Sequence, residues 1–366
     1  MNRTVVTCLT LDQIDFVPTV IVGYYQSEKR KTFIHHCEQL QARFPDAVII
    51  GSSSESNLYD DPPHLDTDGS HVCVFSCIDI DRDAFTIEQL DIADDGVIEV
   101  DPQRSYRAII LASSYYTGIE DQLKNLQSLL GYNSLYGGIA SGREHGQFSV
   151  GELYYEGEFL SDTMLVWLID QERYELRGVT SHYFQPVGFE MEITAAEGKT
   201  IYEIENRPAL EVVEEIAGAL TPENLAAFEH PFFLKDEGAL NFDDALLCSL
   251  REVNREDNSI DVFREVAVRN TLKIGISIDR ASLKQQLDVF RQYRQRNAMA
   301  FLFICVGIKE NLGKMEPFYL MYLKKSLKIP FVGFHSYGEI GPVNTHRGSA
   351  LHNQTISLAV LSERGE

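Results

Sequence analysis

Apolar runs alternate with amphipathic segments in three parts of the chain. In residues 19–51, 108–138 and 299–333, an apolar run is followed by a segment with helical spacing and then by a second apolar run that ends at glycine. The helices are expected near residues 31–44, 119–131 and 315–327. Parallel strands need a long connection between them, so strand, helix and strand within about 30 residues indicates a parallel crossover. The chain therefore predicts three copies of one α/β unit.

The segments that follow the three copies are also alike. Each copy continues into glycine and small polar residues: Gly51-Ser-Ser-Ser-Glu, Gly137-Gly-Ile-Ala-Ser-Gly and Gly333-Phe-His-Ser-Tyr-Gly-Glu. A further apolar run then predicts another strand, at residues 71–80, 163–169 and 355–361. We expect an α/β fold in which repeated strand-helix-strand units form mixed sheets covered by helices, in two interlocked halves.

The region between the second and third copies has a different pattern. Residues 188–194 and 199–205 alternate apolar and polar side chains, which is typical of antiparallel strands with one solvated face. Pro208 suits the first turn of a helix, where its missing N–H has no partner to lose. We place a domain boundary near Arg207. Residues 280–296 carry Leu283, Leu287, Phe290 and Tyr293 at helical spacing and predict a basic helix.

Composition and charge narrow the classes of partner. Of 366 residues, 44% are hydrophobic and 24% charged, the proportions of a globular chain. The formal net charge of −23 repels phosphate backbones and anionic lipid, which argues against nucleic acid and membrane insertion. Residues 281–328 are the exception, with nine basic and three acidic side chains. This segment is either a solvated helix face or a surface for an anionic ligand or acidic partner.

Cysteine usage and the lack of long apolar runs indicate the compartment. None of the six cysteines forms a Cys-x-x-Cys pair, and most lie in apolar stretches, as in reduced proteins. The N-terminal residues lack a signal-length apolar run, and the longest apolar stretches are far short of the roughly 18 residues that span a bilayer. We expect a cytoplasmic protein.

The predicted sheet edge offers a candidate ligand site. Ligands of open parallel sheets bind beyond the carboxyl ends of the strands, and here those ends are rich in Gly, Ser and Tyr, with few charges. Such groups suit a small zwitterionic or polar ligand. The candidate ligand-binding residues are Gly137, Gly138, Ser141, Cys305, Gly333, His335, Ser336, Tyr337 and Glu339.

Motifs of nucleophilic, nucleotide-binding and zinc enzymes are missing. The chain has no Gly-x-Ser-x-Gly, no Gly-x-x-x-x-Gly-Lys-Ser/Thr, no His-Glu-x-x-His and no Cys/His zinc spacing. We therefore expect no catalytic residues and ligand binding without turnover. The alternative is a small-molecule hydrolase that uses Glu339 or Ser141.

Several of these segments resemble a known family. The stretch from Phe331 to Pro342, followed by Leu351-His-Asn-Gln-Thr355, is similar to the C-terminal signature of FIST-domain proteins. Residues 301–307, 137–141, 184–188 and 204–210 are similar to other parts of the family. The resemblance covers residues 18–361 and implies an N-terminal FIST domain at 18–206 and a C-terminal one at 207–361.

Two positions depart from the family pattern. Where many members carry Arg after the third copy's first strand, this chain has Ile308-Lys309, and where Tyr is common it has His335. If that Arg holds a ligand carboxylate, Lys309 would hold it less well, because an ammonium is a point charge and a guanidinium is a planar fork.

The resemblance implies an intracellular sensory domain for an amino-acid-like ligand. Family members usually work with histidine kinases, cyclic-di-nucleotide enzymes or chemotaxis receptors. This chain carries no such segment, so we expect it to signal by contact with a partner such as a histidine kinase or a cyclic-di-nucleotide signalling protein.

A subset of stand-alone members resembles haem-binding nitric-oxide sensors, which adds a second possibility. Such a sensor would hold noncovalent haem b through one axial histidine, and His182 is the candidate because it lies where the chain passes between the two halves. Tyr183, Phe184 and Val187 would supply apolar walls, and residues 284–296 would meet the propionates. His182 is otherwise a hydrogen-bonded histidine at a strand end.

Overall fold

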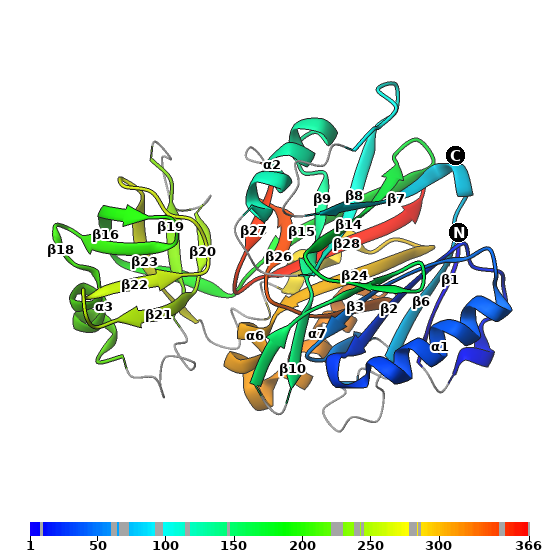
Figure 1. Cartoon of the computed structure of the whole chain (residues 1–366), viewed down its shortest axis with the longest axis horizontal. Helices are drawn as coiled ribbons and strands as arrows, with labels where there is room; N and C mark the ends of the chain where they lie inside the picture. Colours follow the sequence, from blue (N-terminus) through cyan, green and yellow to red (C-terminus); the bar gives the residue numbers. More distant parts are fainter. Residues whose placement is uncertain are drawn as a thin grey trace. The chain divides into compact units, whose positions relative to one another are not determined.

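The computed structural model describes most of the chain. It covers residues 1–7, 10–59, 64–65, 73–91, 98–113, 118–144, 147–220, 230–237, 242, 245–277, 284, 287–343 and 348–364. These residues form two compact units (Figure 1). The first holds residues 1–181, 287–351 and 356–366, and the second holds residues 182–286 and 352–355.

Three strand-helix-strand copies build the first unit. They are β2 (Val20–Gln26), α1 (Arg30–Arg43) and β3 (Val48–Ser54); β8 (Tyr106–Ala112), α2 (Ile119–Leu130) and β9 (Leu135–Ile139); and β24 (Ala298–Cys305), α7 (Glu316–Leu327) and β25 (Phe331–Ser336). In each copy the two strands pair in parallel. The predicted crossovers and the α/β fold class are confirmed.

A third strand completes each copy. β6 (Cys73–Asp79), β14 (Thr163–Asp170) and β28 (Ile356–Glu363) pair antiparallel with the first strands of their copies. The predicted strand at residues 71–80 begins at Cys73 among the described residues, because residues 71 and 72 lie outside them. The three copies therefore share one strand order: third, first, second.

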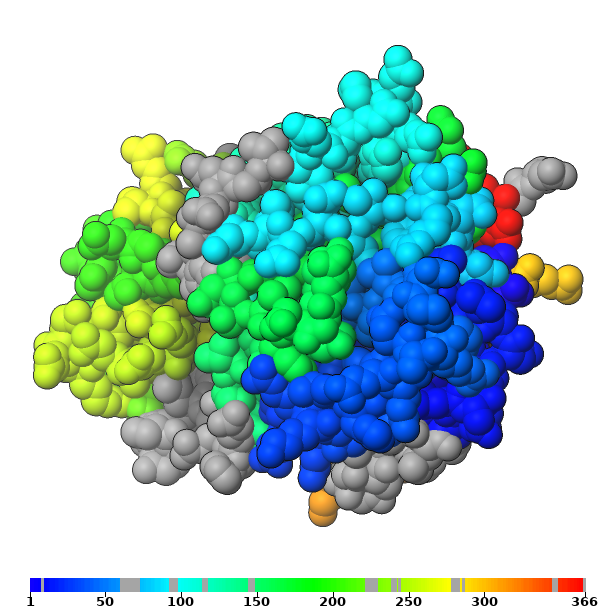
Figure 2. Space-filling model, turned by 45° about the vertical axis from the view of Figure 1, so that its right-hand side comes forward, coloured from blue at the N-terminus to red at the C-terminus, as the bar shows by residue number. Residues whose placement is uncertain are grey.

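The copies are joined by short strands that leave one copy and pair with another. β4 (Asn57–Tyr59) follows β3 but pairs with β25, β26 (Glu339–Pro342) follows β25 but pairs with β9, and β12 (Leu153–Tyr155) pairs with β3. The register is the same each time, since Leu58, Ile340 and Tyr154 lie opposite Gly333, Gly137 and Gly51. The exchange is cyclic: the first copy gives a strand to the third, the third gives one to the second, and the second gives one to the first. In Figure 2 the green surface of residues after β9 adjoins the blue surface of the first copy.

Most of the remaining strands of the first unit widen the three sheets. β1 (Asn2–Thr7), β7 (Phe85–Asp91) and β15 (Tyr174–Ser181) pair with the third strands of the copies. The others are β5 (His64–Leu65), β13 (Glu158–Leu160), β27 (Ser349–His352) and the hairpin β10 (Ser141–Glu144) and β11 (Gln147–Val150), which forms a separate two-stranded sheet. Helix α6 (Val306–Leu312) links β24 to α7.

Burial explains why the strands are apolar on both faces. One face contributes to a core shared by all three copies, in which Tyr24, Tyr136 and Phe334 are almost fully buried. The other face packs on helices: α1 covers β2 and β3, and α2 lies beside β9 (Figure 1). Trp167 and Phe301 join the second and third copies through an edge-to-face contact at 5.7 Å between ring centroids.

The described residues of the second unit form an antiparallel sheet with the helix α3 (Ala209–Ala217). Its elements are β16 (Phe184–Glu197), β17 (Thr200–Ile204), β18 (Arg207–Pro208), α3 (Ala209–Ala217), β19 (Phe232–Lys235), β20 (Leu246–Cys248), β21 (Leu250–Asn254), β22 (Ser259–Val262) and β23 (Thr271–Ser277). The two predicted strands lie in β16 and β17, and Pro208 precedes the first turn of α3. The unit has its own apolar core.

The predicted basic helix at residues 280–296 is α-helical at two of its described residues, Lys284 and Leu287. Asp288–Tyr293 forms a 3₁₀ helix, η4, and residues 294–296 lie outside any helix. Leu287, Phe290 and Tyr293 are three residues apart, which is the repeat of a 3₁₀ helix. Leu287 and Phe290 are buried, and the Tyr293 hydroxyl donates to the Gly178 carbonyl at 2.8 Å.

Two further features concern the whole described chain. The described cysteines are all buried, and none of them forms a disulfide. No helix among the described residues is long and apolar enough to cross a membrane.

Candidate functional site

The strand exchange brings three loop segments of the first unit together. The N–H of His335 donates to the carbonyl of Ser56 at 3.0 Å, and the N–H of Glu55 donates to Ser141 Oγ at 2.9 Å. Ser141 Oγ in turn donates to the carbonyl of His335. Each copy contributes the segment at the carboxyl end of its second strand. The loops meet because each exchanged strand must cross from one sheet to the next.

A serine, a histidine and a glutamate lie in line at this meeting point. Ser56 Oγ is 2.8 Å from His335 Nδ1, and His335 Nε2 is 2.8 Å from Glu316 Oε1. All three residues are at most 5% exposed. Ser56 comes from the loop after β3, His335 from β25, and Glu316 from the first turn of α7.

Beside this line lies a buried carboxylate with two cations. Lys309 Nζ donates to Glu55 Oε1 at 2.9 Å and to Ser56 Oγ at 3.0 Å. Arg143 Nη2 lies 3.2 Å from the same Glu55 oxygen and 3.2 Å from Glu310 Oε1. The other oxygen, Glu55 Oε2, is buried and has no hydrogen-bond partner among the described residues. The side chains of Lys309 and Arg143 are 20% and 38% exposed, so they stand between the buried carboxylate and solvent.

A second buried carboxylate forms a hydrogen bond with the loop after β25. Glu339 is fully buried and accepts a hydrogen bond from Ser336 Oγ at 2.7 Å. The hydroxyl of Tyr337 donates to the carbonyl of Gly142, and burial raises the pKa of this tyrosine. These contacts hold the loop against the segment that follows β9.

The predicted site residues fall into two groups. Ser141, His335, Ser336, Tyr337 and Glu339 lie at the meeting point, and Gly138 packs against Ser336, whose Cβ would be 3.1 Å from an added Cβ.

The remaining three predicted residues have roles within the sheets. A Cβ on Gly137 or Gly333 would lie 1.9 Å from the carbonyl oxygen of Ile110 or Leu302, so packing between strands explains these two glycines. Cys305 ends β24 opposite Ser336 and is 5% exposed.

The sequence analysis missed five residues of the site. Glu55, Ser56, Arg143, Lys309 and Glu316 were not among the candidates. Glu55 and Ser56 carry a signal in the sequence, because they follow Gly51 as Ser141 and His335 follow the glycines of the other copies. Lys309 was noted as a departure from the family pattern. Arg143 and Glu316 carry no comparable signal, since their position depends on how the copies meet.

His182, the candidate haem ligand, lies away from this cluster in the chain and is the first residue of the second unit. Its ring contacts Phe233 edge to face, with 5.4 Å between ring centroids. Burial lowers its pKa to about 4. Tyr183 and Phe184 are buried and stack on each other at 4.6 Å. Within the described parts of the chain, no three His, Cys, Asp or Glu side chains come together as a metal site.

Comparison with known proteins identifies the class to which this fold and site belong. The FIST N domain matches residues 25–207, and the FIST C domain matches residues 209–342. The chain therefore belongs to the FIST family of signal-transduction sensory domains, which bind small ligands. The resemblance to FIST-domain proteins seen in the sequence is confirmed.

The chain is also similar to two mycobacterial proteins. An uncharacterized protein of Mycobacterium bovis and one of Mycobacterium tuberculosis are each 29% identical to it over 198 residues. The match covers 51% of this chain and 51% of each relative. The chain thus spans about half the length of the curated relatives it matches.

Proposed function

We propose that the chain is a sensor of a small ligand that carries both an ammonium and a carboxylate group. The observation that carries the proposal is Glu55 Oε2, a buried carboxylate oxygen without a described hydrogen-bond partner. Such an oxygen costs about 1–3 kcal/mol while it stays unpaired. A ligand ammonium would satisfy it, and Arg143 and Lys309 beside it would bind the carboxylate. In this proposal the ligand is bound without turnover.

A thermal-unfolding series tests this proposal. An amino acid is compared with the amine that lacks its carboxylate and the acid that lacks its ammonium, and the mixtures are analysed for products. We expect stabilisation only by compounds with both groups, about 2.7 kcal/mol at a hundred times the dissociation constant. Glu55→Gln should lose the effect, and Glu310→Gln, on a side chain that is 50% exposed, should keep it. Failure of every amino acid, or stabilisation retained in Glu55→Gln, would overturn the proposal.

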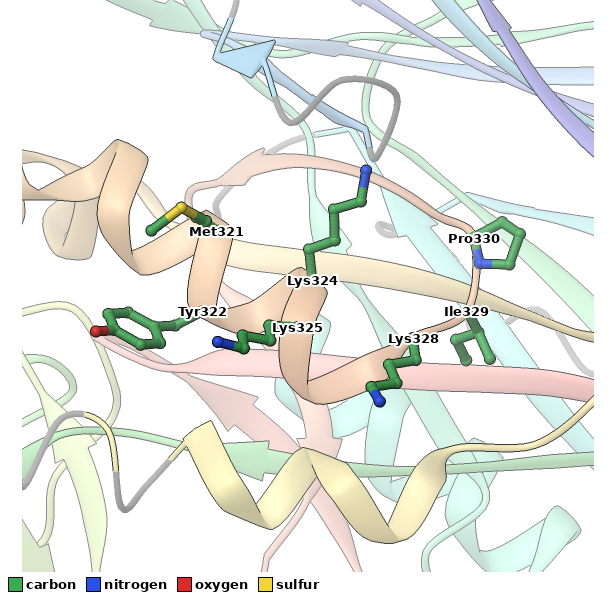
Figure 3. A pocket seen from close by; sticks show the side chains of 7 residues that line it. All are labelled: Met321, Tyr322, Lys324, Lys325, Lys328, Ile329 and Pro330. Atoms are coloured by element: carbon green, nitrogen blue, oxygen red, sulfur yellow. The ribbon is translucent and has the colours of Figure 1, made fainter.

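We further propose that the signal passes by contact with an acidic protein partner, such as a histidine kinase or a cyclic-di-nucleotide signalling protein. Helix α7 offers the surface. Phe318, Met321 and Tyr322 are 54%, 48% and 41% exposed. Met321 and Tyr322 border a depression of about 610 Å³ whose lining continues through Lys324, Lys325, Lys328, Ile329 and Pro330 (Figure 3). Apolar side chains beside three lysines, in a chain with net charge −23, favour an acidic partner with apolar anchors.

Charge reversal tests the α7 surface. Partners are captured from native cells by cross-linking, identified, purified and titrated against the sensor at two salt concentrations. We expect Lys325→Glu combined with Lys328→Glu to weaken binding at least tenfold, and salt to weaken the wild-type complex. Lys31→Glu, on the exposed side of α1, is the control. A captured partner that binds the double variant as tightly as the wild type would contradict the proposal.

His182 supports a second candidate function, a haem-based nitric-oxide sensor. The lowered pKa keeps its imidazole neutral at neutral pH, the form that binds iron. His182 would hold haem b by one axial bond, with Phe233 against the imidazole, and the iron would supply the binding site for nitric oxide. A buried, neutral imidazole is a suitable axial ligand for haem iron, so His182 fits the cofactor. Phe184 and Tyr183 stack on each other, so only the outer side of this pair would contact the haem.

Reconstitution with haem tests the second candidate. We expect a sharp Soret band that shifts when nitric oxide is added, and its loss or displacement in His182→Ala. His35→Ala, on the exposed side of α1, should leave the spectrum unchanged. A spectrum of free haem would reject the cofactor, and an unchanged spectrum in His182→Ala would reject this ligand.

A further inference from the structure

Ser56 differs from the other serines of the site in its hydrogen bonds. Ser141 Oγ bonds to backbone on both sides, and Ser336 Oγ donates to Glu339. Ser56 Oγ instead lies between Lys309 Nζ at 3.0 Å and His335 Nδ1 at 2.8 Å. Both of these partners of the Ser56 hydroxyl are side chains. The hydroxyl is therefore placed for proton transfer to the His335 imidazole.

The hydrogen bonds of Ser56 allow the proton arrangement that acyl transfer needs. A lysine ammonium only donates hydrogen bonds, so Ser56 Oγ accepts from Lys309. The direction of the bond between Ser56 Oγ and His335 Nδ1 depends on the tautomer of His335, and the reaction uses the tautomer in which Nδ1 is the acceptor and the ring proton sits on Nε2. Nε2 lies 2.8 Å from Glu316 Oε1, a close contact without the alignment of a hydrogen bond. Serine, histidine and carboxylate then stand in the order that activates a serine hydroxyl.

We propose that Ser56 is a nucleophile that takes an acyl group from an activated ester or thioester. Ser56 Oγ forms a bond to the carbonyl carbon while its proton moves to His335 Nδ1. The bond to the leaving alcohol or thiol then breaks, and the leaving group takes the proton from His335. Water removes the acyl group by the same route, so the sum is an ester or thioester plus water giving a carboxylic acid and an alcohol or thiol. This activity goes beyond ligand sensing.

The surroundings of Ser56 supply the other requirements of acyl transfer. The Lys309 ammonium, 3.0 Å from Ser56 Oγ, stands where negative charge develops on the carbonyl oxygen. Ser56 is 5% exposed, and the 20% exposed side chain of Lys309 lies between it and solvent. A substrate therefore reaches Ser56 along Lys309. Glu316 acts through His335 as a positioning residue.

Labelling of the purified full chain with a fluorophosphonate probe tests the proposal. Ser56 Oγ would attack phosphorus and release fluoride, and mass spectrometry of the peptides would locate the label. We expect one label per chain on Ser56, and a burst of p-nitrophenol from p-nitrophenyl acetate. Ser56→Ala should abolish both, and Ser128→Ala, on the exposed side of α2, should change neither. Thermal unfolding checks that each variant is folded.

The variant Glu316→Gln tests whether Glu316 positions His335 for the reaction or only stabilises the fold. We expect the limiting rate of labelling to fall on the order of 100-fold while the probe concentration for half-saturation stays the same. A variant that labels at the wild-type rate would reject the role of Glu316. A folded wild-type chain that is not labelled at millimolar probe, or a label on another residue, would overturn the proposal. The sensor function would survive that result, because amino-acid binding is measured separately.

Discussion

A glycine on the second strand of each copy allows the sheets to pack. Gly137 and Gly333 face the carbonyl oxygens of Ile110 and Leu302, and Gly51 faces the ring of Phe33 on α1. An added Cβ would lie at 1.9 Å, 1.9 Å and 2.7 Å from these groups. No side chain fits such distances. The repeated glycines are therefore required by strand and helix packing.

Replacing one of these glycines should destabilise the protein strongly. We expect Gly333→Ala to lower the free energy of unfolding by about 3 kcal/mol, because the methyl group must displace a backbone carbonyl. Urea unfolding measures the change. Gly157→Ala is the control: its φ is +88°, with no atom within 4 Å of the added Cβ, and only about 1 kcal/mol of backbone strain is expected. Equal losses in the two variants would contradict the steric explanation.

His182 should make stability depend on pH. Its pKa is lowered by burial to about 4 in the folded chain, against the ordinary 6.5. As pH falls below 6.5 the unfolded state takes up the proton first, so stability is lost between about pH 6.5 and pH 4, by up to about 3 kcal/mol. Unfolding measured at pH 7 and pH 4.5 should show a smaller loss in His182→Asn than in wild type. His35→Asn should behave as wild type, and the same loss in all three proteins would exclude His182 as the cause.

Some residues of the site could be predicted from the sequence alone, and others could not. His335 and Ser141 could be predicted because each follows a glycine at the end of an apolar strand. Lys309 was noted only as a departure from the family pattern, and nothing near Glu316 in the sequence marks it. The packing of α6 and α7 brings the two residues to His335 and Ser56.

At the scale of elements, the local pattern of apolar and polar residues was sufficient to predict a helix or strand that is long and periodic. The strands and helices of all three copies were predicted, and β16, β17 and α3 as well. The exchanged strands were not, because three or four residues of strand carry no preference for one sheet edge over another. In the basic segment, Leu283, Leu287, Phe290 and Tyr293 were taken for one α-helix. Leu287 is α-helical, and the spacing by three that follows it is the repeat of the 3₁₀ helix η4.

The exchanged strand β4 should be important for the third sheet. Leu58 is fully buried and lies opposite Gly333. We expect Leu58→Ala to lower the free energy of unfolding by about 2–5 kcal/mol, the usual range for a buried leucine. Hydrogen exchange should quicken at β25 more than at β8. Leu129→Ala, whose side chain is 43% exposed, should change stability by less than about 0.5 kcal/mol. Uniform loss of protection would contradict a local role for β4.

At the scale of the molecule, the two family domains depend on each other. The N-terminal match ends at residue 207, so it contains β4 and β9, while their partners β25 and β26 lie in the C-terminal match. Either half alone exposes strand edges that the other half covers, and exposed edges aggregate. The sequence analysis expected interlocked halves from the repeat; the structure identifies the strands that interlock them.

Expression of the halves tests this dependence. Residues 1–206 and 207–366, produced separately, should be insoluble or lack cooperative unfolding. Produced together, with a tag on one half only, they should copurify in a ratio of one to one and unfold with a single transition. Two halves that each unfold cooperatively on their own, and do not copurify, would show that the strand exchange is dispensable.

The strand exchange also determines when the site can form. Ser56 and His335 are 279 positions apart along the chain. At about 5–20 residues per second, a ribosome needs roughly 15 to 55 s to pass from one to the other. During that interval the nascent first copy holds Ser56 and β4 without their partners His335 and β25. Chaperone binding to this intermediate would influence the yield of working protein, and slow codons between the two positions would lengthen its exposure.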